Sequence, residues 1–355
     1  MSVRDVAISA LAAWCFAGLT GALAQPQDLA AVPPTPHDYT PKTTSWGAPD
    51  FRGTWPIDHL NGTPLQRDPK YGNRVFLSDE EFAQKEKFLQ GFQERYAKEE
   101  QSGQIGIGHW AESGEANRRT SLIVGPADGR LPALTPEGKR LGALMRSSWR
   151  KGQSFDWVTD FDSWDRCITR GMPASMFPFQ YNNGLRIFQS PGIVAIQMEM
   201  VHETRIIPTD GRPPVPMQLR NWIGYSRGHW EGKDTLVVET SNFRPGPSAT
   251  NIGTTGSPPE NDTPVSEQAR MVERFTMTGP DSIVYEMTWT DPVVFSRPWT
   301  ARLDWKRDDK YGIFEYACHE GDEQIRNYIT SSRAQRAAAA AKAAAPPAPA
   351  PAGRT

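Results

Sequence analysis

The stretch Gly192-Ile-Val-Ala-Ile-Gln-Met-Glu-Met-Val-His-Glu-Thr-Arg205 decides the fold class. Successive side chains of a strand point to opposite faces of a sheet, and this stretch alternates in that way. One face carries Val194, Ile196, Met198, Met200 and His202, and the other carries Gln197, Glu199, Glu203 and Arg205. The alternation predicts one long strand in the wall of a β-barrel or curved sheet, with an apolar face that ends in one imidazole.

The same period of two continues through most of the second half of the chain. It predicts further strands at 185–189, 220–230, 235–243, 270–278, 282–290, 299–307 and 313–319, joined by short turns such as Glu231-Gly-Lys-Asp234. Two of these strands have clear inner faces, which are Ile283, Tyr285, Met287 and Trp289 in one, and Trp299, Ala301, Leu303 and Trp305 in the other. Consecutive antiparallel strands with one apolar face predict a mainly β fold, an antiparallel barrel or meander that encloses a ligand cavity.

Helices are expected at both ends of this meander. Ser78-Asp-Glu-Glu81 is a capping box, and Thr135-Pro-Glu starts a second helix with proline at its first position. Ser121–Val124 predicts a short strand between them. We therefore expect a partly helical N-terminal cover on the barrel, and a C-terminal helix from Glu323.

The ends of the chain have a different composition from its middle. Residues 1–24 have the apolar core and the Ala-Leu-Ala cleavage site of a secretory signal peptide, which predicts a periplasmic or secreted protein. Residues 25–45 are expected to be a flexible linker, 46–333 a single domain, and 334–355 a disordered Ala/Pro-rich tail. No other stretch is long and apolar enough to cross a bilayer.

Composition and motifs narrow the class of partner. The formal net charge is −2 and the pI is about 6.3, with basic residues scattered, which argues against nucleic acid as a partner. The chain has no Gly-x-Ser-x-Gly, no phosphate-binding glycine loop and no Rossmann fingerprint. We expect a small-molecule ligand or substrate and no cofactor, and the oligomeric state stays open.

Two cysteines remain after Cys15 leaves with the signal peptide. In an oxidising compartment Cys167 and Cys318 predict a disulfide, and two buried thiols are the alternative. No metal site is predicted, because the cysteines and histidines lack the spacing of metal ligands. Asp156, Asp160, Asp162 and Asp165 are expected to form a solvated acidic turn rather than a calcium loop.

Several segments taken together resemble a family of uncharacterised exported bacterial proteins. They are Trp46-Gly-x-Pro-Asp-x-x-Gly-Thr-Trp55, Thr120–Val124 with Leu134–Gly138, Glu199-Met-Val-His202-x-x-Arg205, Arg227–Gly232 with Asp234–Glu239, and Glu315–Gly321. The resemblance covers most of the mature chain and implies no particular activity. Gly53-x-Trp55 also resembles the first-strand signature of lipocalin-like barrels, a likeness of fold that does not imply function.

The candidate site residues lie on the predicted strands, and which face of these strands lines the cavity stays open. His202, Glu199, Arg205, His319 and Tyr316 are the candidates for acid/base chemistry. Met198, Met200, Tyr225, His229, Tyr285 and Trp289 are the candidates for ligand contact, because aromatic and thioether groups suit apolar rings.

Two functions fit this set, and a third interpretation is an envelope interaction protein, suggested by the Ala/Pro-rich tail and the long polar loop at 245–264. The first is an exported β-barrel that binds a small, partly apolar or aromatic molecule and converts it by cofactor-free acid/base chemistry of the lyase, isomerase or hydrolase type. The alternative is a non-catalytic periplasmic binding or carrier protein with the same cavity. Whether the protein is an enzyme stays open at this point.

Overall fold

The computed structural model describes residues 28–103, 111–112, 114–148, 150–246 and 263–345. The predicted signal peptide lies outside the described residues, as do residues 247–262 and the last ten residues of the expected tail. Among the helices of the described residues, none is long and apolar enough to cross a membrane.

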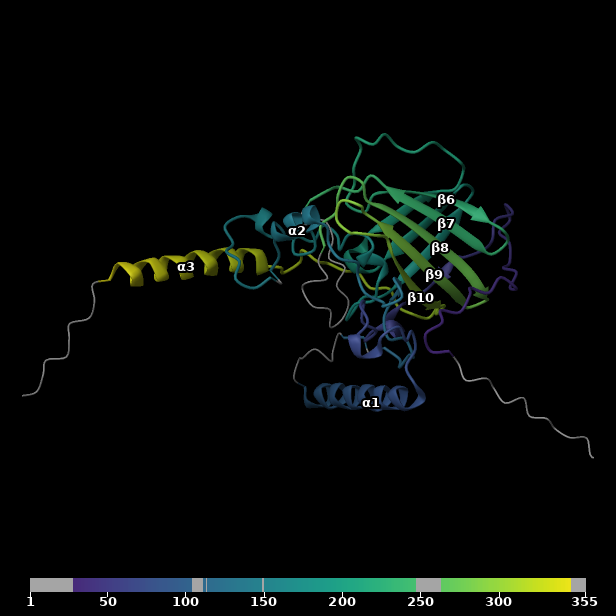
Figure 1. The fold of residues 1–355 in the computed structure, drawn as a ribbon, viewed down its shortest axis with the longest axis horizontal. Helices are drawn as coiled ribbons and strands as arrows, with labels where there is room; N and C mark the ends of the chain where they lie inside the picture. The colour runs from purple at the N-terminus through teal and green to yellow at the C-terminus, as the bar shows by residue number, and fades with distance from the viewer. Residues whose placement is uncertain (1–27, 104–110, 113, 149, 247–262, 346–355) are drawn as a thin grey trace, which may run out of the picture.

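The fold is mainly β, as predicted, and consists of two antiparallel sheets (Figure 1). The four-stranded sheet has the order β1-β3-β4-β5, with β1 at Gly53–Thr54, β3 at Leu185–Ser190, β4 at Ile193–Met198 and β5 at Thr204–Pro208. The six-stranded sheet has the order β2-β10-β9-β8-β7-β6, with β2 at Ile123–Gly125, β6 at Tyr225–Glu231, β7 at Thr235–Ser241, β8 at Arg270–Gly279, β9 at Ser282–Thr290 and β10 at Trp299–Lys306.

The interior between the two sheets is filled by side chains. The inner rows predicted for β9 and β10 are confirmed, since all eight residues are at most 2% exposed. Their rings pack on one another and on β8, with centroids 5.0 Å apart for Tyr285 and Trp305 and 4.9 Å apart for Phe275 and Tyr285. Both sheets contribute to one hydrophobic core. The expected ligand cavity inside a barrel is therefore occupied by protein side chains in this region.

The opening stretch is a hairpin, so the prediction of one long strand is wrong. β4 ends at Met198 and β5 begins at Thr204, with a short 3-10 turn at Met200–His202 between them. Val201 has φ of 61° and His202 has φ of 42°, in the left-handed region, so the chain reverses there. The Glu199 carboxylate accepts hydrogen bonds from the backbone N–H groups of Gly184 and Phe314, and these contacts replace strand pairing at that point.

Both predicted N-terminal helices form, and the segment expected as a linker contacts the folded domain. Helix α1 (Asp79–Ser102) has the Ser78 capping box, and α2 (Pro136–Ala143) begins with proline after Thr135. Residues 28–44 lie along the folded domain rather than acting as a tether. His37 contacts Asp234 at 3.1 Å, and the Pro33 carbonyl accepts a hydrogen bond from Arg302.

The C-terminal end departs from the prediction in two ways. The segment 313–319 forms no strand, because its backbone is held by the turn at Glu199 and by the disulfide instead of a neighbouring strand. Helix α3 (Gln324–Ala344) continues ten residues past the predicted start of the tail. Alanine has the highest helix propensity, which explains why this Ala-rich run is helical. Figure 1 shows α3 extending away from the sheets.

The two sheets meet at a seam between β5 and β6. Ile207 of β5 packs on Gly228 of β6, where a side chain on the glycine would lie 3.0 Å from an Ile207 methyl group. In the part of the chain that the structure describes, no strand hydrogen bonding joins β5 to β6. The sheets therefore do not close into a barrel at this point, and the seam is where the wall is open.

Candidate functional site

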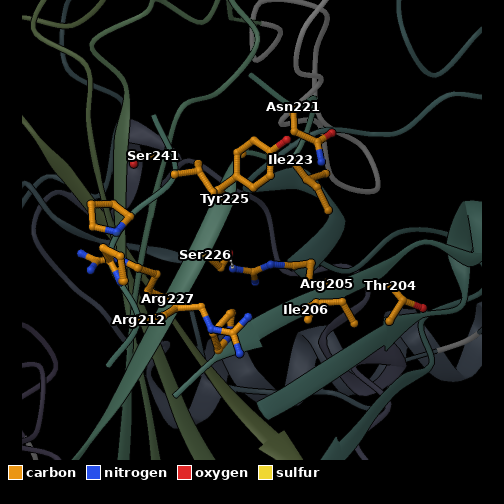
Figure 2. Close-up of a pocket in the computed structure, with 15 residues that line it drawn as sticks. Thr204, Arg205, Ile206, Arg212, Asn221, Ile223, Tyr225, Ser226, Arg227 and Ser241 are labelled. Atoms are coloured by element: carbon orange, nitrogen blue, oxygen red, sulfur yellow. Dashed lines mark hydrogen bonds between the residues drawn. The ribbon is translucent and has the colours of Figure 1, made fainter. Parts of the chain in front are cut away.

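A cleft of about 360 Å³ lies at the seam between β5 and β6 (Figure 2). We call it the seam cleft. Its lining residues come from β5 (Thr204, Arg205, Ile206, Pro208), from the connection that follows β5 (Arg212, Pro213, Pro214, Val215, Asn221, Ile223, Gly224), from β6 (Tyr225, Ser226, Arg227) and from the end of β7 (Ser241). This volume is within the range of small-molecule sites.

A buried ion pair forms the floor of the seam cleft. Arg205 is 1% exposed and donates two hydrogen bonds to Glu273 of β8, at 2.9 and 2.6 Å. Its second terminal nitrogen also donates to Ser226 at 3.1 Å, and Figure 2 shows the guanidinium turned toward that residue. Burial by itself would lower the pKa of Arg205, but the charge of Glu273 and the hydrogen bonds to it outweigh this effect and raise that pKa.

The floor is extended into the core by a phenol. Tyr285 donates to Glu273 at 2.9 Å, and its pKa is raised well above the usual value by burial and by the Glu273 charge. Breaking either half of such a pair leaves an uncompensated charge in the core, so the floor is rigid. The predicted site residue Arg205 is thus buried and faces inward. Arg205 was predicted on the face opposite to Val194, on the assumption of one continuous strand. A hairpin separates the two residues instead, so the alternation does not continue from Val194 to Arg205.

The wall and roof of the cleft are mostly apolar and are held in place by one asparagine. Ile206, Pro208, Pro213, Pro214, Val215 and Ile223 supply the apolar lining. Asn242, buried and with φ of 58°, donates through its side-chain amide to the carbonyls of Pro216 at 2.9 Å and Leu219 at 3.1 Å. These hydrogen bonds tie the proline-rich connection to the end of β7.

Two further guanidinium groups lie at the cleft. Arg212 is paired with Asp210, which accepts three hydrogen bonds from it at 2.6 to 3.1 Å. Arg227 has Glu239 at 3.7 Å, which is beyond hydrogen-bond distance. The described residues that line the cleft include no carboxylate, imidazole or thiol. The cleft therefore offers donors and apolar surface, but no general base among these residues.

Of the predicted site residues, Arg205 and Tyr225 line this cleft. His229 follows Tyr225 on the outer face of β6 and is exposed, and it does not line the cleft. Met198, Tyr285 and Trp289 lie in the main core, and Met200 lies in a second apolar cluster with Trp164 and Phe179. Because other protein side chains cover these four residues, they are placed as core residues in this structure.

Glu199 is buried and has every carboxylate oxygen engaged. Besides Gly184 and Phe314, it accepts hydrogen bonds from Asn182 at 3.0 Å and from the Tyr311 hydroxyl at 3.0 Å. A general base needs a free lone pair directed at a substrate, and four donors leave Glu199 without one. The arrangement fits a residue that holds the β4–β5 turn.

Tyr311 links Glu199 to a second carboxyl group that the sequence argument missed. Its hydroxyl lies 2.9 Å from Glu112 and 3.0 Å from Glu199. A phenol has one proton and donates to only one of them, so the other contact is a hydrogen bond only when that carboxyl is protonated. Burial raises the pKa of Glu112, which favours the protonated form of this carboxyl group relative to an exposed glutamate. The pKa of Tyr311 is also raised, by burial and by the two carboxyl charges.

His202, Tyr316 and the two cysteines are brought together at the surface. Cys167 and Cys318 form a disulfide with a Cα–Cα distance of 5.6 Å, which confirms that prediction. The His202 ring lies 2.9 Å from the Tyr316 carbonyl oxygen and is exposed. The prediction that His202 ends the apolar face of a strand is wrong, since the left-handed turn carries this side chain out to the surface. His319 is exposed as well.

No group of three or more His, Cys, Asp or Glu residues that could hold a metal ion occurs among the described residues. Aspartates of the segment 156–165 accept hydrogen bonds from backbone N–H groups of its turns. Asp160 accepts from the backbone of Asp156 at 2.7 Å, and Asp162 accepts from that of Trp164 at 2.8 Å. Burial and the neighbouring Asp165 charge raise the pKa of Asp162 to about 6.

Sequence reasoning missed Arg212, Arg227, Asn242 and the prolines of the roof. The available signal was Asp210-Gly-Arg-Pro-Pro-Val-Pro216, a proline-rich run between two strands with arginines near both of its ends. Comparisons with protein-family models, with curated proteins and with solved structures found no match for this chain.

Proposed function

We propose that this protein is an exported binding protein that holds a small, partly apolar molecule in the seam cleft without converting it. The observation that carries the proposal is the cleft itself, with an apolar wall of isoleucine, valine and proline side chains and with polar groups that include three arginines and no carboxylate. Sites of this composition orient a ligand by a few polar contacts and bind it mainly through buried apolar area.

Binding is favoured over catalysis by where the titratable groups lie. None of the acid/base candidates of the sequence except Arg205 lines the seam cleft. Glu199 is engaged by four donors and Arg205 by Glu273, Tyr316 is half-buried and stacks on Tyr181, and His202 and His319 are exposed. An acid/base enzyme needs such a group within hydrogen-bond reach of its substrate. The residues that line the seam cleft supply none, so this proposal follows the carrier alternative.

Export is part of the proposal and is supported by two features. The N-terminal sequence has the composition of a signal peptide, and the Cys167–Cys318 disulfide suits an oxidising compartment. The protein would therefore bind its ligand outside the cytoplasm, where it would capture or deliver that ligand.

The test is a comparison of cleft-blocked and control variants by calorimetry. The probes are 3-phenylpropionate, 3-phenylpropanamide, octanoate and octanamide. Ser241→Trp fills the cleft from the end of β7, whereas Val272→Trp places the same ring on an exposed position of β8, outside the cleft. We expect at least one probe to bind the wild type and Val272→Trp alike, and to bind Ser241→Trp at least about tenfold more weakly. Equal binding to both variants, or no binding by any probe, overturns the proposal.

A further inference from the structure

We infer that the ligand of the seam cleft is an amphipathic carboxylate, whose anionic group is held by Arg227 and whose apolar body lies along the proline wall. This inference rests on the proposed function and adds the chemical class of the ligand. Three guanidinium groups line the cleft, and they differ in what already neutralises them.

Two of the three have a carboxylate partner. Arg205 donates two hydrogen bonds to Glu273 within the core. Arg212 is bound by Asp210 through both its Nε and a terminal nitrogen. Short, paired hydrogen bonds of this kind are the strong ones, and a ligand anion would have to displace a charge that is already well placed.

Arg227 is the exception. Among the described residues it makes no hydrogen bond, and its nearest carboxylate, on Glu239, lies 3.7 Å away, with both side chains about half exposed. An ion pair of that length and exposure contributes little. A guanidinium has five N–H donors in a fixed fork that matches the two oxygens of a carboxylate. Arg227 therefore has its donors free to bind an anion at the cleft.

The floor supplies a second unsatisfied donor. The Nε of Arg205 is buried and has no hydrogen-bond partner in the described structure, although both terminal nitrogens are bonded. A buried donor without a partner is costly. Other buried arginines of the described residues share this feature, and Arg205 differs from them in lining the seam cleft. Arg205 and Arg227 line the same cleft from opposite sides of the seam, on β5 and β6.

The rest of the lining suits the apolar part of such a ligand. Ile206, Pro213 and Pro214 form a wall without hydrogen-bond donors, since proline has no N–H. Tyr225, 36% exposed, presents its ring at the cleft. No lining residue is acidic, so the carboxylate of a ligand has no carboxylate of the cleft lining in direct contact with it.

Two matched comparisons test the inference by calorimetry. The ligands 3-phenylpropionate and 3-phenylpropanamide have nearly the same shape and differ in charge, and inorganic phosphate serves as an anion without an apolar body. Arg227→Gln removes the guanidinium. Arg274→Gln is the control, and it removes another arginine of the same sheet. The Arg274 side chain is 37% exposed, against 40% for Arg227, but it is paired with Glu231 and does not line the cleft.

We expect the wild type to bind the propionate roughly ten- to a hundredfold more tightly than the amide, and far more tightly than phosphate. Arg227→Gln should remove the preference for the propionate and leave amide binding unchanged, whereas Arg274→Gln should keep both. Arg227→Lys should keep part of the preference, since it retains the charge but loses the fork. Melting curves check that each variant is folded.

The outcomes separate this inference from the proposed function. Equal binding of propionate and amide, with loss of both in Ser241→Trp, overturns the carboxylate assignment and leaves the proposed function intact. A propionate preference that survives in Arg227→Gln also overturns the role of Arg227. Phosphate binding as tight as that of the propionate shows that the apolar wall is not used, and it contradicts the inference. No binding by any probe overturns both.

Discussion

The interior between the sheets and the seam between β5 and β6 are both formed by antiparallel strands, yet the interior is filled by side chains and the seam is open. Inside, Tyr285, Trp305 and Phe275 pack ring against ring and leave the β9 and β10 inner rows at most 2% exposed. At the seam, strand pairing stops and a cleft of about 360 Å³ remains. Large inner side chains fill the space between the sheets, so the space for a ligand lies at the seam, where β5 and β6 are not paired.

The two regions also share one element, the Arg205–Glu273 pair. Glu273 lies in the interior at 0% exposure, and Arg205 reaches it from the seam. The pair therefore couples the packing of the core to the floor of the cleft. Variants that change the interior, the seam or the ends of the fold should separate the contributions of these regions.

The largest effect is expected from removing the disulfide, which joins the segment before β3 to the segment after β10. Cys167 and Cys318 are 151 residues apart, and closing so long a loop stabilises by about 5 kcal/mol in the chain-entropy model. The double variant Cys167→Ser/Cys318→Ser should lower the free energy of unfolding by about 3–5 kcal/mol in urea melts. At temperatures where it stays folded, probe binding at the seam should match the wild type. An unchanged midpoint would contradict the expectation.

The next largest effect is expected from the shared ion pair. Glu273→Gln leaves the Arg205 charge buried without compensation, which should cost about 3–5 kcal/mol of unfolding free energy. Replacing both residues, as Arg205→Met/Glu273→Leu, should recover most of that loss. Urea titrations measure both. A single variant as stable as the wild type would show that Arg205 reaches water, and that the floor of the cleft is not part of the core.

A smaller effect is expected from Glu112, on the pH dependence of the unfolding free energy. Burial raises the pKa of Glu112 above its ordinary value of 4.5, so the folded protein binds this proton more tightly than the unfolded chain. Its contribution is therefore fully present below pH 4.5 and is lost as the pH rises through the folded-state pKa. Glu112→Gln should flatten the fall in stability over that window by at most about 1.4 kcal/mol per pH unit, the value for one proton. A parallel pH profile for the variant would refute the shared proton.

The smallest effect on stability is expected on the outer face of the seam. Tyr225 is 36% exposed and makes no contact with the core rings described above. Tyr225→Ala should change the unfolding free energy by no more than about 0.5 kcal/mol. It should nevertheless weaken 3-phenylpropionate binding severalfold, because the ring borders the cleft. A loss of stability comparable to a core substitution would place Tyr225 in the interior region.

The sequence predicted the packed region well and the open region poorly. The period of two identifies inner rows such as Ile283 to Trp289, because burial on one face demands that alternation. It does not show whether large rings meet across the interior, so the cavity was expected where the core is. It also missed the hairpin in 192–205, since the alternation of Met198 and Met200 continues through a turn that is held by Glu199. Contacts between distant segments, such as Tyr311 with Glu112, leave no local pattern.

The most direct test of the central claim is hydrogen–deuterium exchange with and without saturating 3-phenylpropionate. If ligands bind at the seam, amide exchange should slow in β5, in the connection at 212–219 and in the first half of β6. Exchange in β8, β9 and β10 should stay as it is in the free protein. Slower exchange confined to β8–β10, with no change at β5 and β6, would place the ligand inside the sheets and contradict the account.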